Sequence, residues 1–203
     1  MRPTKADLEA ARDRLIPDVL PPDGAPLRVL FSGINPGLYS AATGHHFARP
    51  GNRFWPALHR SGFTDRLLHP SEQDLLPGHG LGITNIAPRA TARADELTDE
   101  ELRDGGRRLT ALVERHRPAY LAICGVTAYR TAFGRPRAGI GPQDEAFGPA
   151  RLWILPNPSG LNASWQPDRL AAEFARLREA ADAAADAVRT TSGRAPRSPR
   201  TSC

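Results

Sequence analysis

The chain has 203 residues, of which 40% are hydrophobic and 24% are charged. This length is enough for one domain with a sizeable core, and no run of 18 apolar residues indicates a membrane span. The first residues lack the apolar segment of a signal peptide, so we expect a soluble cytoplasmic protein with no membrane partner. Two cysteines cannot build a four-thiolate site, and the histidines show no metal-ligand spacing beyond His45-His46. We therefore expect neither a metal nor another cofactor.

The net charge of +5 is concentrated near the carboxyl end of the chain. Residues 189–203 contain four arginines and no acid, which leaves 23 basic and 22 acidic residues in 1–188. Only Lys5 is a lysine, so Schiff-base catalysis would depend on this one residue. We expect 1–188 to form a single domain and 189–203, which lacks large apolar side chains, to be a disordered basic tail.

Helical and strand patterns alternate along the chain. A first helix is predicted to begin after Thr4 and to end before Pro17. Continuous apolar runs predict four buried strands, at residues 27–31, 81–86, 119–124 and 152–155. Further helices are predicted over about 51–61, from a capping box at Thr98 to about 115, over 127–133, and from Pro167 onward. The pattern predicts a three-layer α/β/α fold around a short, four-stranded, mainly parallel sheet.

Two loops at strand exits carry the residues of a candidate site. Gly33-Ile34-Asn35-Pro36-Gly37 follows the first predicted strand, and Asn157-Pro158-Ser159-Gly160-Leu161-Asn162 follows the fourth. Ligands of parallel sheets bind beyond the carboxyl ends of the strands, so we expect both loops at one edge. Neither loop is a nucleotide P-loop, because no Gly-Lys-Ser/Thr follows. Glycine, proline and asparagine also make ordinary tight turns, so the motifs by themselves leave both interpretations open.

Three segments, in this order, carry a resemblance to a known family: GINPGLYSAATGHHFARPGNRFWPAL (33–58), GITNIAPR (82–89) and LPNPSGLN (155–162). Residues 26–180 resemble the mismatch-specific uracil/thymine-DNA glycosylases of the uracil-DNA glycosylase superfamily. The resemblance implies the fold of that superfamily and a monofunctional glycosylase without lyase activity. Such an enzyme flips uracil, thymine or another damaged pyrimidine opposite guanine out of the duplex and hydrolyses its N-glycosidic bond, which initiates base-excision repair.

The resemblance also implies a partner and a setting. The partner is double-stranded DNA with a G:U or G:T mismatch, with single-stranded DNA as a second possible substrate. We expect a monomer, cytoplasmic and of bacterial type, that meets the nucleoid through its DNA substrate.

The same resemblance assigns roles around the flipped base. Asn35 would hold the attacking water. An amide cannot act as a general base at neutral pH, so its contribution would be to orient the water and stabilise an oxocarbenium-like sugar. Phe47 would stack on the base, the backbone of Ile34 and Phe47 would recognise the uracil edge, and Asn85 would contact the base or the water. A turn asparagine and a core phenylalanine are the alternative interpretations.

The second loop would open the base stack. Leu161 fits the wedge that fills the space of the extruded nucleotide, and Gly160 and Asn162 would bond the widowed guanine through backbone groups. Some relatives carry an arginine in this loop, where Ala163 and Ser164 follow here. Three residues are candidates for contacting DNA phosphates, or else solvated surface residues: Ser40, Arg53 and Ser159.

Asp95 is a further candidate catalytic residue, and two other functions compete with that of a glycosylase. Asp95 lies in the loop that leaves the second predicted strand, where it could act as a true base or be a solvent-facing or helix-capping acid. The competing function is a non-catalytic DNA-damage or nucleotide-binding module on the same fold. The combination of Asn35, Phe47 and Leu161 favours the enzyme, because a binding module needs no amide that holds a water. A nucleotide hydrolase is disfavoured, because no carboxylate cluster marks the strand exits.

Overall fold

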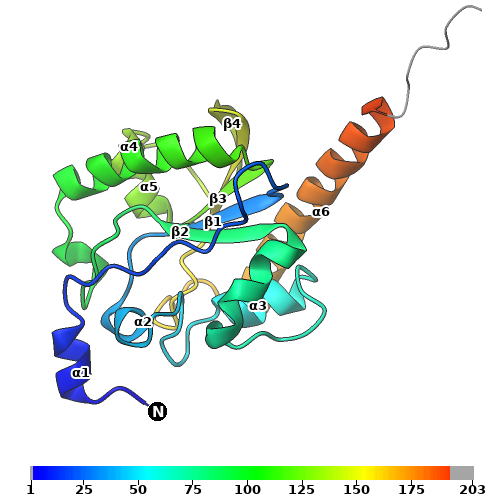
Figure 1. Cartoon of the computed structure of the whole chain (residues 1–203). Helices are drawn as coiled ribbons and strands as arrows, with labels where there is room; N and C mark the ends of the chain where they lie inside the picture. The colour runs from blue at the N-terminus through cyan, green and yellow to red at the C-terminus, as the bar shows by residue number, and fades with distance from the viewer. Residues whose placement is uncertain (1, 193–203) are drawn as a thin grey trace, which may run out of the picture.

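The four predicted apolar runs form the parallel part of a central sheet in the computed structural model, which describes residues 2–192 (Figure 1). The strands are β1 (Val29–Gly33), β2 (Leu81–Asn85), β3 (Tyr120–Cys124) and β5 (Ala150–Leu155). Their order in the sheet is β2-β1-β3-β5, with every pair parallel. All five residues of β1, β2 and β3 are buried, as expected for strands that are covered on both faces.

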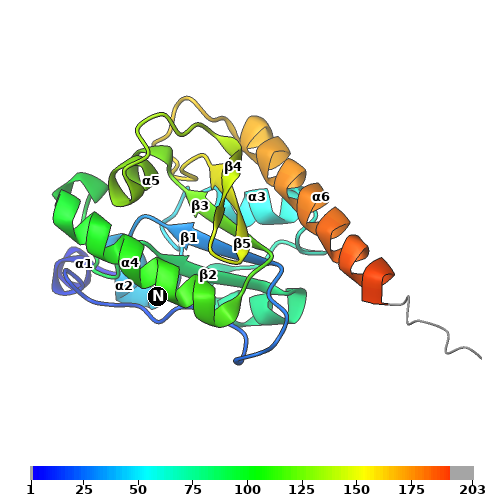
Figure 2. The same ribbon diagram turned by 90° about the horizontal axis from the view of Figure 1, so that it is seen from above.

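Helices cover the two faces of the sheet. Figure 2 shows α4 (Asp99–His116) and α5 (Val126–Phe133) on one side and α3 (Phe54–Arg60) and α6 (Pro167–Ser192) on the other. Successive side chains of a strand point to opposite faces, so β1 serves both layers. The Phe31 ring packs edge-on against Phe54 of α3 and stacks on Phe174 of α6, with centroid distances of 5.4 and 5.8 Å. Leu30 belongs instead to the apolar cluster that contains Leu109 of α4. The predicted α/β/α layers are confirmed.

The helix starts follow the capping signals in the sequence. Thr98 accepts from the backbone of Glu101 and the Glu101 carboxylate bonds back to Thr98, so the predicted capping box opens α4. Thr4 caps α1 (Lys5–Ala10), which is shorter than the predicted helix. The other helical segments are α2 (Leu38–Thr43), and the 3-10 helices η1 (Pro70–His79) and η2 (Ala94–Glu96). No helix in residues 2–192 is long and apolar enough to cross a membrane.

The sheet has a fifth strand that was not predicted, so the predicted strand count is wrong by one. β4 (Gly141–Phe147) pairs antiparallel with β5 at the edge of the sheet, and its register shifts between Pro142 and Ala146. Its sequence, GPQDEAF, is mostly polar, and most of these residues are at least partly exposed to solvent. An irregular, solvated edge strand has no continuous apolar run by which it could be recognised.

The boundary of the predicted tail also differs. We expected disorder from residue 189, whereas α6 continues through Ser192. Residues 193–203 of the predicted tail lie outside the described residues.

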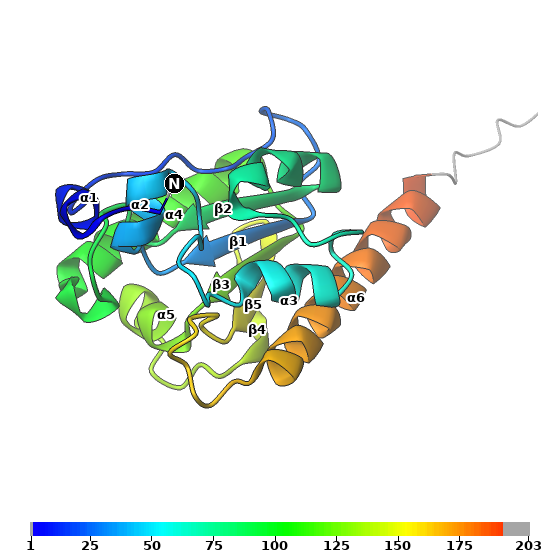
Figure 3. The ribbon, with the colours of Figure 1, turned by 90° about the horizontal axis from the view of Figure 1, so that it is seen from below.

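The register brings the strand exits to one edge. Gly33 of β1 lies opposite Asn85 of β2, and Cys124 of β3 lies opposite Leu155 of β5. Figure 3 shows α2 and the segment that follows β5 at the edge towards which the β1 arrow points. The two loops that the sequence singled out therefore share the carboxyl edge of the sheet, where ligands of such sheets bind.

Candidate active site

A cavity of about 680 Å³ lies at the carboxyl edge of the sheet, and we call it the central cavity. Its lining includes eight residues that the sequence singled out: Ile34, Asn35, Ser40, Phe47, Asn85, Asp95, Ser159 and Leu161. Arg53 and Gly160 line a smaller neighbouring hollow of about 370 Å³, together with Leu161. The loops after β1, β2 and β5 thus contribute to one site.

The Asn35 carboxamide is held in one orientation. Its Nδ2 donates to the backbone carbonyl of Arg89 at 2.9 Å and to the Thr91 hydroxyl at 2.7 Å. A backbone carbonyl can only accept, and the Thr91 Oγ1 donates its own hydrogen to the Arg93 carbonyl at 2.7 Å. Both amide hydrogens of Asn35 are therefore used within the protein. Its Oδ1 accepts no hydrogen bond from the described residues, so this oxygen is the part of the amide that can bind a water.

Two residues that were not predicted from the sequence set this orientation. Thr91 is buried. Arg89 is fixed by its guanidinium, which bonds the Glu101 carboxylate at 2.6 Å and Asp13 at 2.8 Å. The Arg89 contact and the backbone N–H of Thr98 lower the pKa of Glu101 to about 2. The segment after β2 is therefore anchored to the start of α4, and its short polar sequence carries no signal that would reveal this.

Asp95 lines the central cavity, but its carboxylate is already engaged. The exposed Arg93 guanidinium bonds both Asp95 oxygens, at 2.9 and 2.5 Å, and lowers the pKa of that carboxyl. A carboxylate with a lowered pKa is a weaker base. Asp95 also belongs to the short η2 helix that precedes α4. This arrangement favours the alternative of a solvent-facing acid over a second catalytic residue.

A relay of three residues orients the Asn85 amide. His46 Nε2 lies 2.9 Å from the Pro17 carbonyl, so Nε2 must carry the ring hydrogen, because that oxygen only accepts. His46 Nδ1 then accepts from Asn85 Nδ2 at 3.3 Å. Burial lowers the pKa of His46, which favours the neutral ring that this relay needs. Asn85 retains its Oδ1 and a second N–H for a ligand.

The side chains of Asn85 and Phe47, which line the central cavity, pack closely against Gly33. A Cβ at Gly33 would lie 2.4 Å from Asn85 Oδ1 and 3.3 Å from the Phe47 ring, so a larger residue would displace the Asn85 amide. The Phe47 ring stacks on Phe54 with centroids 4.1 Å apart and planes 15° apart. Phe47 adopts a φ of 53°, a strained conformation for a bulky residue. Its backbone N–H donates to no group in the described residues. Such strain is commonly found at functional sites.

The loop after β5, which we call the 157–165 loop, is stabilised by its own hydrogen bonds. Ser159 N donates to Asn157 Oδ1 at 3.0 Å, and Asn162 Nδ2 donates to the Asn157 carbonyl at 3.0 Å. The Ser159 hydroxyl accepts from Leu161 N at 3.3 Å. Leu161 is 76% exposed, although leucines are usually buried in a folded domain. The loop thus presents one apolar side chain to solvent.

Ser40 and Arg53, two of the three candidate phosphate contacts, are already bonded to other groups of the protein. Ser40 is buried, and its hydroxyl accepts from the backbone of Ala48 at 3.2 Å. The Arg53 guanidinium points into the protein, where it bonds the backbone carbonyls of Gly160, Asn162 and Trp165. Backbone groups of Gly160 and Asn162 were predicted to bond a guanine, and the carbonyls of both residues already accept from Arg53. These contacts depend on loop conformation, which the residue types did not reveal.

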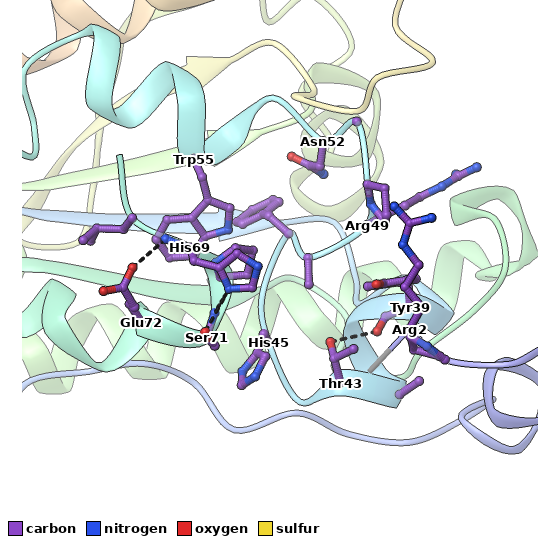
Figure 4. A pocket seen from close by; sticks show the side chains of 18 of the residues that line it. Arg2, Tyr39, Thr43, His45, Arg49, Asn52, Trp55, His69, Ser71 and Glu72 are labelled. Carbon is purple, nitrogen blue, oxygen red and sulfur yellow. Dashed lines mark hydrogen bonds between the residues drawn. The ribbon is translucent and has the colours of Figure 1, made fainter. Parts of the chain in front are cut away.

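A second and larger hollow adjoins the central cavity, and we call it the outer cleft. It has a volume of about 1210 Å³ and shares Phe47, Arg49 and Asn52 with the central cavity. Figure 4 shows Arg2, Tyr39 and Arg49 together at one side of it, and His69, Ser71 and Glu72 together at the other. The outer cleft extends the site beyond the central cavity.

Comparison with known proteins agrees with this architecture. The family model described as the uracil DNA glycosylase superfamily matches residues 21–181. The fold is also similar to the solution NMR structure of a candidate uracil DNA glycosylase from Methanosarcina acetivorans. The two are 21% identical, with a TM-score of 0.54, over 82% of this chain and 98% of that one. Since the family match spans most of the sequence, including every loop of the central cavity, the chain belongs to the uracil DNA glycosylase superfamily.

Proposed function

We propose that this protein is a monofunctional DNA glycosylase that excises uracil, and also thymine, paired with guanine in duplex DNA. The observation that carries the proposal is the fixed orientation of the Asn35 amide at the carboxyl edge of the sheet. Its Nδ2 bonds Arg89 and Thr91, which leaves Oδ1 to bind a water. A binding module would gain nothing from an amide that is restrained in this way.

The chemistry assigned to Asn35 is positioning. Its Oδ1 accepts a hydrogen bond from the water and directs the water's lone pair towards C1′ of the flipped nucleotide. As the N-glycosidic bond lengthens, the sugar gains positive charge, and the amide oxygen dipole stabilises that charge. Water adds to C1′, and the base leaves as an anion that the site stabilises or protonates. An amide takes no proton, so the water loses its proton to solvent or to the departing base.

Base recognition is assigned to Phe47 and Asn85. One face of the Phe47 ring is covered by Phe54, so a planar base would stack on the other face. The Asn85 amide can donate to a uracil carbonyl through its free N–H and accept the uracil N3–H through Oδ1. The free backbone N–H of Phe47 is a further donor to the base edge. These groups complement a keto-imide edge, which uracil and thymine share.

Two features support hydrolysis without strand cleavage and a preference for duplex DNA. Lys5, the only lysine, lies on α1 and lines neither the central cavity nor the outer cleft. A Schiff base with the sugar therefore has no lysine amine in either cavity. The exposed Leu161 side chain suits the wedge that fills the gap after a base is flipped.

The test uses duplexes with one uracil or thymine opposite guanine, incubated with excess protein and then treated with alkali, which breaks the strand at abasic sites. We expect breaks only after alkali, and no covalent adduct with borohydride. Asn35→Ala should slow single-turnover excision at least tenfold, or about 1.4 kcal/mol of barrier. Gln143→Ala removes a matched amide on β4 and should not change it. Binding of these duplexes without any break would instead support the non-catalytic DNA-binding module.

A further inference from the structure

We propose that Arg53 is a positioning residue that holds the 157–165 loop, and with it Leu161, in the shape needed to enter DNA before DNA binds. This inference rests on the proposed function. It also replaces the phosphate contact that the sequence suggested for Arg53, because the guanidinium is directed into the 157–165 loop.

Arg53 donates to four carbonyls of one loop. Its backbone N–H bonds the Pro158 carbonyl at 2.9 Å. Its guanidinium bonds the carbonyls of Gly160 at 3.2 Å, Asn162 at 3.0 Å and Trp165 at 2.7 Å. The planar guanidinium has five N–H donors in a rigid fork, so one arginine can bridge three carbonyls in a way that lysine cannot. Two of these carbonyls belong to the residues that flank Leu161.

The other end of Arg53 is anchored in the core. Arg53 immediately precedes α3, whose first residue, Phe54, is fully buried and donates its backbone N–H to Asn52 Oδ1 at 2.9 Å. Among the described residues, no carboxylate forms an ion pair with Arg53. The hydrogen bonds that Arg53 donates therefore all link the start of α3 to the 157–165 loop.

A second contact joins the same two segments. Gly160 lies so close to Gly51 that an added Cβ would be 2.4 Å from the Gly51 carbonyl oxygen. Only glycine permits this approach, so the loop packs directly on the segment that precedes Arg53. The exposed Leu161 lies between the loop residues that these two contacts hold. A wedge that is already ordered loses less conformational entropy on binding than one that must be ordered by DNA.

The proposal is tested first without DNA. Backbone amide exchange in residues 157–165 should accelerate at least tenfold in Arg53→Met, because the carbonyls on either side of Leu161 lose their shared donor. Arg60→Met is the matched control: Arg60 is the last residue of α3, which Arg53 precedes, and pairs with Asp168 at the start of α6. It should leave exchange in the loop unchanged. Arg53→Lys, which keeps the charge, should give an intermediate acceleration.

A double-mutant cycle then connects the loop to excision. On duplex DNA, Arg53→Met should lower the single-turnover rate at least fivefold in the wild-type background and less than twofold in the Leu161→Ala background. Non-additivity of this kind shows that Arg53 acts through Leu161. Unchanged loop exchange, or equal losses in both backgrounds, would overturn the proposal. Wild-type protein that excises no base would refute the proposed function alone, because exchange still measures the loop.

A different observation carries a second inference: we infer that the outer cleft binds the phosphate backbone of the DNA strand that carries the target base. Three arginines line it, Arg2, Arg14 and Arg49, and their side chains form no ion pair or hydrogen bond with described residues. Of the two acids in its lining, Glu72 pairs with Arg66, whereas Asp7 accepts from Thr4 and interacts electrostatically with Arg14. With three arginines and two carboxylates, the lining has a net charge of +1, and Arg49 also lines the central cavity.

Salt dependence separates this inference from a general effect of charge. The slope of log K against log salt is negative, and loss of one phosphate contact reduces its magnitude by about 0.9 for duplex DNA. We expect a decrease of this size for Arg2→Gln and for Arg14→Gln, whether or not the duplex contains uracil. Arg117→Gln removes the same charge at the end of α4, outside the cleft, and should leave the slope unchanged. Slopes that do not change in Arg2→Gln and Arg14→Gln, or that change equally in all three variants, would overturn the inference.

Discussion

The Asn35 carboxamide and the Thr91 hydroxyl lie 2.7 Å apart, and this hydrogen bond has a fixed direction. Thr91 gives its hydrogen to the Arg93 carbonyl, so it can only accept from Asn35. The direction of this short chain determines that Asn35 presents an oxygen, not a nitrogen, to the central cavity. Thr91 thereby controls the chemistry of a neighbour without needing to touch the substrate.

Thr91→Val tests this relationship, because valine has nearly the same shape but no hydroxyl. One of the two bonds that orient the amide is lost, and the amide can rotate to present Nδ2 to the water. We expect single-turnover excision to fall about tenfold, or about 1.4 kcal/mol of barrier. Thr91→Ser keeps the hydroxyl and should retain most of the rate. An active Thr91→Val variant would mean that the Arg89 carbonyl alone orients Asn35.

The Arg89–Glu101 pair predicts that the free energy of unfolding decreases at acid pH. The pKa of Glu101 is lowered from 4.5 to about 2, chiefly by Arg89, so the folded protein binds a proton at this site less readily than the unfolded chain. Its contribution is present above pH 4.5 and is lost as the pH falls towards 2. Glu101→Gln should therefore be less stable than wild type at pH 7, and the difference should shrink below pH 4.5. Denaturant unfolding at several pH values measures this directly.

The His46 relay predicts a second pH effect with its own range. Burial lowers the pKa of His46 below 6.5, so between that lowered value and pH 6.5 the unfolded chain binds the proton more readily. Stability should therefore rise with pH across this range, and the slope should be smaller in His46→Gln. Protonation would also turn Nδ1 into a donor and break its bond with Asn85. The excision rate should then fall at acid pH, with its midpoint at the lowered pKa of His46. If the pH midpoint of excision is the same in His46→Gln as in wild type, His46 is not the group that titrates.

Residue types and strand order predicted where the candidate site lies, but not which neighbouring residues orient its side chains. Asn35 and Asn85 each lie at or just after the end of a buried parallel strand, so their meeting followed from topology. The orientation of Asn35 depends on Thr91, whose buried position results from the path of an irregular loop. Arg53 was assigned to phosphate because an exposed arginine is the usual phosphate ligand, whereas the fold turns it towards three carbonyls. Strand β4 was missed for a similar reason, since its polar sequence becomes a strand only by pairing with β5.

Leu161→Ala should slow excision from duplexes more than from single strands. Leu161 is 76% exposed at the tip of the 157–165 loop, so truncation removes little packing and should hardly change the melting temperature. A wedge is useful only where a base stack must be opened and refilled, and unstacking costs about a few kcal/mol per step. A single-stranded substrate needs no such work, so wild type and variant should converge on it.

The comparison needs a stability control and a substrate that isolates the wedge. Leu75, another exposed leucine at 48%, lies in η1 and lines neither the central cavity nor the outer cleft, and Leu75→Ala should leave both rates unchanged. If single strands prove to be poor substrates, a duplex with uracil flanked by mismatches supplies an already opened stack. Equal losses on stacked and opened substrates, with a lowered melting temperature, would show that Leu161 contributes packing. A loss confined to the stacked duplex would identify the exposed side chain as the part of the loop that replaces the flipped base.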